Sequence, residues 1–204
     1  MVAVKRRTID SILIAAGAVA TLVLATSGGL LTWGHNFSSD YVHNELSSQH
    51  ISFPTTAGLA AEGRSDLDAF AGQKLDSGDG AQAYASYING HLAKIGAGAT
   101  YADLGAPETA ANAAVTAATA AGQSPADVAA LQAKATAITN TRNTLLGETL
   151  RGLLLSAYAW STVGTIAGIA AIGAFIAAAI MAVLVVLGLI HHRRTPAVTP
   201  PAHG

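Results

Sequence analysis

Hydrophobic residues gather in two long windows, one toward each end of the chain. Residues 11–33 contain no ionisable side chain, and no Asp, Glu, Lys or Arg occurs between Arg151 and His191. About 20 apolar residues in a helix cross a hydrocarbon core that is roughly 30 Å thick. The pattern therefore predicts two transmembrane helices, one over residues 11–33 and the other over residues 162–190.

The first window also has features of a cleavable signal peptide. A basic cluster, Lys5-Arg6-Arg7, precedes it, and Ala25-Thr26-Ser27 offers small residues for cleavage. Its apolar character continues as far as Trp33, beyond the usual length of a signal-peptide core, and Trp33 stands where an interfacial aromatic anchor belongs. These features favour an uncleaved membrane anchor.

The second window is longer than one bilayer requires, because a helix rises about 1.5 Å per residue. We expect the helix to project out of the membrane, with Tyr158 and Trp160 at the outer interface. The alternative divides the window at its glycines into two short spans. Those glycines are Gly164, Gly168 and Gly173. Each half would be near or below the minimum length, which favours a single span.

The polar middle of the chain, residues 34–161, shows helical periodicity and no convincing strand. The first helix continues from the membrane, with an apolar stripe made of Phe37, Tyr41, Val42 and Leu46. It ends before Ile51-Ser52-Phe53-Pro54, because the residue before proline favours an extended backbone. We expect this short extended segment to bury Ile51 and Phe53.

Two further helices are expected in the first half of the middle region. One starts at Ser65 as a cap, with Asp68 three residues on, and ends at Ser77-Gly78-Asp79-Gly80. Its inward residues are Leu67, Phe70, Ala71 and Leu75. The other spans residues 81–95 and stops at Gly96. Its inward residues are Tyr84, Ile88, Leu92 and Ile95.

An alanine-rich segment and a strong helix start complete the middle region. Residues 107–121 form either a loosely packed helix or a mobile linker, since alanine favours helix but buries little area. Ser124 as cap, Pro125 at the first position and Asp127 in the first turn predict the next helix. We expect one long helix over residues 125–190, bent near Gly147 or Gly152. Its first part has a stripe that should pack against the extension of the first span: Val128, Leu131, Ala135, Ile138, Arg142 and Leu145.

Charge sets the orientation of these helices. Five of the 11 Lys and Arg residues lie at the terminal flanks, at positions 5–7 and 193–194, beside the two spans. The predicted fold is an all-α membrane protein in which two transmembrane helices extend into an exported helical domain. Residues 1–10 are the cytoplasmic N-terminus, residues 34–161 the extracytoplasmic domain, and residues 191–204 a disordered cytoplasmic tail. The expected location is the plasma membrane.

Composition narrows the possible chemistry. The chain has no cysteine, which excludes disulfides and thiolate sites, and its formal net charge of −1 gives no reason to expect nucleic acid as a partner. The clearest reactive set is His43 and His50, seven residues apart on one helix face, with Asp40 one turn before His43. This face could bind a metal or act as a pH-sensitive contact, or it could be a solvated polar face. No third ligand follows from the spacing, so we predict no metal and no cofactor.

Small residues and one charge pair are candidates for helix–helix contact. Glu148 and Arg151 lie one turn apart and could fix the second long helix to the extension of the first, or form an exposed pair. Gly164 and Gly168 form a small-xxx-small pattern, continued by Ala171 and Ala174, that permits close helix approach. The simplest partner is the first span, through Ala16, Gly17 and Ala20. A homo-oligomer, or a small channel lined by the glycines, is the alternative.

Three segments resemble uncharacterised two-span membrane proteins of actinobacteria. They are residues 36–43 (NFSSDYVH), residues 51–54 (ISFP) and residues 147–155 (GETLRGLLL). The resemblance implies the same two-span architecture and a membrane location. Some members of that group carry a label of aromatic ring-opening dioxygenase. Such enzymes hold ferrous iron with histidine and carboxylate ligands in a soluble fold, and this sequence shows no such set.

The predicted function is contact rather than catalysis. Neither span holds a deep ionisable residue, as proton relays and transporters usually do, and no nucleotide-binding or hydrolase motif occurs. We expect a non-enzymatic cell-envelope protein that acts as a scaffold, accessory subunit or assembly factor, with the lipid bilayer and a membrane or envelope protein as partners. The alternative is a metal- or ligand-binding sensor or enzyme that uses His43, His50 and Asp40.

Overall fold

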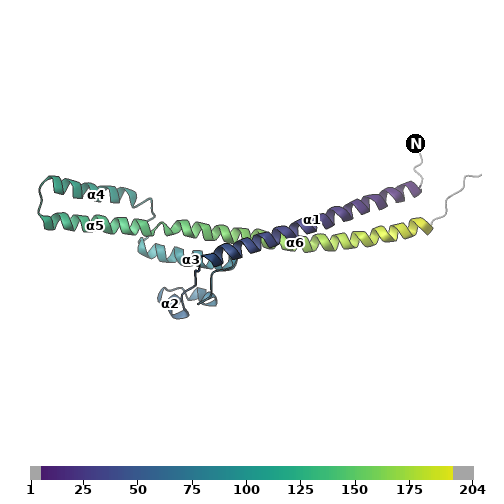
Figure 1. Cartoon of the computed structure of the whole chain (residues 1–204), viewed down its shortest axis with the longest axis horizontal. Coiled ribbons are helices and arrows are strands. Elements are labelled where there is room, and N and C mark those ends of the chain that lie inside the picture. The colour runs from purple at the N-terminus through teal and green to yellow at the C-terminus, as the bar shows by residue number, and fades with distance from the viewer. Residues whose placement is uncertain (1–5, 195–204) are drawn as a thin grey trace, which may run out of the picture. The chain divides into compact units, whose positions relative to one another are not determined.

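The computed structural model describes residues 6–194, with side chains from Thr8 onward. Every element in this range is helical (Figure 1). In chain order these are α1 (Arg6–Ser48), α2 (Thr56–Ala61), the 3₁₀ helix η1 (Ser65–Phe70), α3 (Gly78–Ile95), α4 (Gly105–Ala120), α5 (Pro125–Thr144) and α6 (Gly147–Arg194). The all-helical class is confirmed for this part of the chain. The disordered tail was predicted from residue 191, but residues 191–194 form the last turn of α6. The predictions for Lys5 and for the tail from Thr195 lie outside the described residues.

The chain divides into two compact units. The terminal unit comprises Met1–Ser39 and Thr162–Gly204, and the central unit comprises Asp40–Ser161. Both α1 and α6 contribute residues to each unit.

Helix α1 contains the first apolar window and helix α6 the second. Both helices have the length and composition of membrane spans. Large apolar side chains in these windows are exposed, among them Leu22 at 68% and Ile169 at 67%. Helix α6 continues without interruption through all three of its central glycines. The division of this window into two short spans is therefore wrong.

In the terminal unit, α1 and α6 run alongside each other (Figure 1). Their contact line contains several small residues. On α6, the least exposed positions recur every three or four residues and include Gly164, Ala171 and Ala178. Such a 3–4 alternation is the spacing of left-handed helix pairs. Glycines on both helices lie against side chains of the other helix: Gly17 meets Val185, Gly28 meets Phe175, and Gly188 meets Ile14.

The core of the central unit forms where the end of α1 meets the segment 51–75, α3 and the start of α6. Its fully buried side chains include Leu59 and Leu75, and it also contains Val42, Leu46, Phe53, Leu67 and Leu154. Phe53 stacks on Phe70 with ring centroids 5.2 Å apart and meets the Tyr84 ring edge-on at 5.1 Å. Burial of each large apolar side chain in this cluster contributes roughly 1.5–3 kcal/mol.

The segment between α1 and α3 departs from the prediction in several places. A short helix, α2, precedes η1, and η1 ends at Phe70 with no side-chain cap from Ser65. The reason is Arg64, which occupies the cap position while its guanidinium donates to Asp66 at 2.8 and 2.9 Å and to Ser86. The predicted extended segment is confirmed, with Phe53 buried but Ile51 only partly buried. Its backbone pairs with residues 72–75 around one isolated antiparallel bridge, Ser52 to Lys74.

Helix α3 begins earlier than predicted. The sequence Ser77-Gly78-Asp79-Gly80 starts this helix instead of ending the one before, because the Ser77 hydroxyl accepts a hydrogen bond from the Gly80 N–H at 3.2 Å. The predicted stop at Gly96 is confirmed. Ile95, predicted to be buried, is 38% exposed, because α3 meets the turn before α6 through Leu92, whose side chain lies against Gly147.

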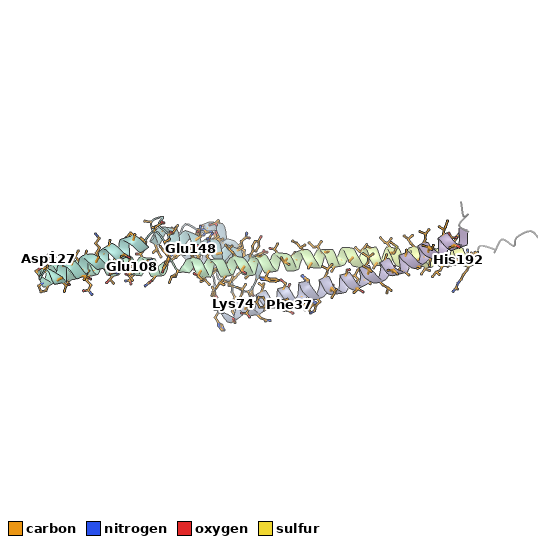
Figure 2. All side chains as sticks on the ribbon, turned by 90° about the horizontal axis from the view of Figure 1, so that it is seen from above. Phe37, Lys74, Glu108, Asp127, Glu148 and His192 are labelled. Atoms are coloured by element: carbon orange, nitrogen blue, oxygen red, sulfur yellow. The ribbon has the colours of Figure 1, made fainter. Side chains whose placement is uncertain are left out.

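Helices α4 and α5 form an antiparallel hairpin (Figure 1). The alanine-rich segment is thus a packed helix and not a mobile linker. The start of α5 is as predicted: Ser124 caps the helix by accepting from the Asp127 N–H, and Pro125 stands at its first position. Figure 2 labels Asp127 at the tip of this hairpin.

The stripe predicted along α5 is its less exposed face, but its partner differs from the prediction. It packs against α4, through a matching row at three- and four-residue spacing that runs from Leu104 to Ala118. The expected single helix over residues 125–190 is two helices, because Leu145 and Leu146 form a turn. The interruption lies one residue before Gly147, close to one of the two glycines named for a bend.

Candidate functional site

An open apolar cavity of about 310 Å³ lies between the end of α1 and the start of α6, both within the central unit. We call it the contact groove. Its α1 wall is formed by Tyr41, Val42, Glu45, Leu46, Gln49 and, just beyond the helix, Ile51. Its α6 wall is formed by Leu150, Leu153, Leu154, Ser156, Ala157 and Trp160. Apolar side chains from two helices therefore border an accessible hollow.

The two faces of α6 at the contact groove differ sharply in exposure. Leu154 is only 2% exposed and belongs to the core of the central unit. Its neighbours Leu150, Leu153 and Trp160 are 40%, 64% and 50% exposed. A soluble helix normally places polar residues on its outer face. An outward apolar face of this kind is typical of a surface that another molecule covers.

On the opposite wall, Tyr41 of α1 continues this apolar surface and is 50% exposed. Beside it, Glu45 and Gln49 provide the polar part of the groove. Aromatic side chains with a polar tip suit such a position, because they bury a large apolar area and keep a hydrogen-bonding group at the edge. The groove thus combines apolar anchors with a polar rim, as protein interfaces do.

An ion-pair network fixes the hairpin of α4 and α5. Arg142 on α5 donates to a carboxylate oxygen of Glu108 on α4 at 2.6 Å, and Thr139 donates to the other oxygen at 2.7 Å. The Arg142 guanidinium also lies 4.0 Å from the Tyr101 ring centroid and donates to the Tyr101 carbonyl. The hydroxyl of Thr139 and the guanidinium of Arg142 hold the pKa of Glu108 below its ordinary value.

The sequence placed Arg142 within an apolar stripe without identifying this network. The missing information was which helix packs against α5. Glu108 lies in the matching stripe of α4. An ion pair between Glu108 and Arg142 can be predicted only if α4 and α5 are known to be neighbours. Figure 2 labels Glu108 on the hairpin.

The histidine face is partly assembled. His43 and His50 both line a cavity of about 390 Å³ that also includes Lys74, Asp76 and Ser47. The Nδ1 atom of His43 lies 3.2 Å from the carbonyl oxygen of Asp76. His50 lies in the turn after α1, with a positive φ of 53°, so the prediction that it shares a helix face with His43 is wrong. Asp40 is exposed and does not line the cavity. Among residues 6–194, no group of three His, Asp or Glu side chains is placed to hold a metal.

Glu148 and Arg151 pair with each other, 2.9 Å apart. Their side chains are 45% and 35% exposed. Neither of the two glycines that flank this pair, Gly147 and Gly152, lies against the first helix. Gly147 packs against Leu92 of α3, and a Cβ at Gly152 would meet no described atom within 4 Å.

Gly164 and Gly168 lie in the terminal unit against α1, at residues other than the predicted ones. A Cβ at Gly164 would stand 2.9 Å from Ser38, and a Cβ at Gly168 would stand 3.0 Å from the His35 ring. The predicted partner Ala16 is exposed, and Gly17 meets Val185 instead. The reason is the antiparallel pairing of the two helices. Gly164 and Gly168 lie at the start of the apolar window of α6, which packs against the end of the apolar window of α1.

His35 is the residue in this region that the sequence interpretation missed. Its Nδ1 atom lies 2.8 Å from the carbonyl oxygen of Gly164, and its ring fills the space above Gly168. A histidine two residues beyond an apolar window does not by itself indicate a helix contact, because nothing in the sequence shows that a glycine faces it.

Comparison with protein-family models, with curated proteins and with solved structures finds no match to this chain. The residues and their geometry are therefore the basis of the functional assignment.

Proposed function

We propose that this chain is a non-enzymatic membrane protein of the cell envelope that acts by protein–protein contact at the contact groove. The observation that carries the proposal is the outward apolar face of α6, with Leu150, Leu153 and Trp160 exposed beside Tyr41. Leaving such a surface in water is unfavourable by roughly 25 cal/mol for each Å² of apolar area. A partner that covers the groove would remove this cost.

The proposed setting is the plasma membrane, with spans at residues 11–33 and 162–190 and both termini in the cytoplasm. Its support is the length and composition of α1 and α6, together with the Lys and Arg residues at the terminal flanks. In this setting residues 34–161 are extracytoplasmic, and the groove is open to envelope proteins. Such a protein would serve as a scaffold, an accessory subunit or an assembly factor.

Site-specific photocrosslinking tests the contact. A photoreactive phenylalanine analogue is placed at Leu153 in the groove and, as the matched control, at the exposed Gln132 of α5. We expect a discrete protein adduct from position 153 and none from position 132. Substituting Leu150→Ser in the protein that carries the photoreactive residue at position 153 should reduce the yield of the adduct severalfold, because it removes an apolar anchor of the same surface.

Two results would count against the proposal. One is a protein that is always isolated alone and monomeric, without any adduct from position 153. The other is an adduct that forms equally from positions 153 and 132, since that would reflect proximity and not recognition. An adduct that consists of two copies of this chain would identify the partner as a homo-oligomer.

A second candidate function is a metal- or ligand-binding sensor or enzyme at the histidine cavity. The observation in its favour is that His43 and His50 share one cavity with Asp76. Metal analysis of the purified chain, with His43→Ala as the control, tests it. This second candidate requires a stoichiometric transition metal that the substitution removes. A chain that does not bind added zinc, copper or iron would exclude the metal site.

A further inference from the structure

A second cavity, of about 460 Å³, lies in the terminal unit between α1 and α6. Its polar lining comes from Thr32, His35 and Thr165, and its apolar lining includes Ile169, Ile172 and Phe175. This volume falls in the range of roughly 300–1,000 Å³ that small-molecule sites occupy. One end of the cavity can therefore hydrogen-bond a ligand while the rest accommodates an apolar body.

The hydrogen-bonding character of His35 follows from its neighbour. The Gly164 carbonyl oxygen can only accept, so the Nδ1 atom of His35, 2.8 Å away, carries the proton and donates it. In the neutral imidazole this leaves Nε2 as an acceptor. Thr32 donates its own hydroxyl proton to the Gly28 carbonyl at 2.8 Å, so its oxygen is also left to accept. The side chains of His35 and Thr32 thus each offer an acceptor that a donor on a ligand can meet.

The geometry of the glycines keeps this ring in place. A Cβ at Gly168 would stand between 3.0 and 3.3 Å from three atoms of the His35 imidazole. Any larger residue at position 168 would displace the ring from the cavity wall. The absence of a side chain there lets the ring lie flat against α6 while its Nδ1 reaches Gly164.

From these contacts we infer that the cavity binds a lipid-soluble phenol, whose hydroxyl donates to Nε2 of His35 and whose aromatic ring lies beside Phe175. The inference rests on the proposed membrane setting, because Thr32 and residues 165–175 belong to the proposed spans and a ligand must reach them through lipid. It does not depend on the contact groove. An acyl chain would fill the apolar lining but would offer no donor to Nε2 of His35 or to the Thr32 hydroxyl oxygen.

The test compares 4-nonylphenol with its methyl ether, 4-nonylanisole, which has the same apolar body but no donor. Equilibrium binding to the full chain in nanodiscs is measured against empty nanodiscs, which account for partition into lipid. We expect saturable binding of the phenol at one site and a dissociation constant about three- to tenfold weaker for the ether. His35→Phe should reduce phenol binding to the level of the ether, and His91→Phe in the central unit should leave it unchanged.

A filling variant separates loss of the ligand site from loss of helix pairing. Ile172 is 64% exposed, so Ile172→Trp can occupy the cavity without disturbing the contact between His35 and Gly164. We expect it to abolish saturable binding of both compounds. Equal binding of phenol and ether, binding no greater than that of empty nanodiscs, or full binding by Ile172→Trp would each overturn the inference. A chain that fails to enter nanodiscs would overturn the membrane setting as well, whereas a failed crosslink at Leu153 would bear only on the contact groove.

Discussion

The terminal and central units place their large apolar side chains in opposite ways. In the terminal unit, small residues face the helix contact and large apolar residues face outward. A Cβ added at Gly164 would stand 2.9 Å from Ser38, whereas Leu22 is 68% exposed. In the central unit, Leu59 and Leu75 are fully buried. The distribution of large apolar residues is thus inverted between the two units.

The inversion is the distribution expected if the terminal unit lies in lipid, as proposed, and the central unit lies in water. Water drives large apolar groups inward, and their burial stabilises the central unit. Lipid gives no such drive, so helices in a bilayer associate through close packing of small residues and through hydrogen bonds such as the one from His35 to Gly164. The contact groove is the exception within the central unit, because its apolar residues face outward there.

The largest effect should come from the core of the central unit. Leu59→Ala removes a side chain that is 0% exposed and leaves a cavity, which should lower the free energy of unfolding by about 2–5 kcal/mol. Leu22→Ala in the terminal unit removes an outward side chain and should have little effect. Denaturant unfolding in detergent, with limited proteolysis of the central unit as the readout, measures the loss of stability in both variants. Equal losses would contradict the inversion.

Enlarging a glycine at the helix contact should have the next largest effect. Gly164→Val forces a side chain against Ser38 and should cost about 1–3 kcal/mol of helix pairing, whereas at Gly173 no described atom lies within 4 Å and Gly173→Val should be tolerated. Because the chain has no cysteine, the substitutions Ile14→Cys and Gly188→Cys report pairing by disulfide formation. A lower disulfide yield for Gly173→Val than for Gly164→Val would contradict the contact line.

The hairpin should respond to pH through Glu108. Because its pKa is lowered in the folded chain, its ionised form stabilises the hairpin above the ordinary glutamate pKa, and this contribution is lost as the pH falls through the folded value. We expect Glu108→Gln to lower the Tm at neutral pH by a few degrees and to match the unaltered chain in acid. Thr139→Val, which removes one hydrogen bond to Glu108, should show a smaller loss with the same pH trend. A lower Tm of Glu108→Gln that persists in acid would indicate that the substitution disturbs packing and does not act through the charge of Glu108.

The smallest effect should come from the pair of Glu148 and Arg151. Each side chain is more than a third exposed, and the two residues are three apart on one helix, so Glu148→Gln should cost less than about 0.5 kcal/mol. The same unfolding experiment measures it. A loss as large as that of Glu108→Gln would restore the hypothesis that this pair fixes two helices together.

Local signals in the sequence predicted those features that depend on a few neighbouring residues. The start of α5 follows from Ser124, Pro125 and Asp127, whose hydrogen bonds stay within one turn. The apolar windows and the end of α3 at Gly96 are equally local.

The features that failed depend on partners distant in sequence. Ser65 has the spacing of a cap, yet Arg64 holds the cap position through contacts that include Ser86, 22 residues away. The stripe on α5 was recognised, but its partner was not, because its spacing fits any adjacent helix. His35 and Gly164 are 129 residues apart, and neither carries a signal for the other.

Cysteine accessibility tests the membrane placement of the two units most directly. Single cysteines are introduced at Ala113 of α4, at Val198 near the C-terminus and at Leu22 within the first window, and intact cells are treated with a membrane-impermeant maleimide. We expect labelling of Ala113→Cys in intact cells, labelling of Val198→Cys only after permeabilisation, and labelling of Leu22→Cys only in detergent. Labelling of Ala113→Cys only after permeabilisation, or of Leu22→Cys in intact cells, would contradict a two-span protein with an extracytoplasmic middle.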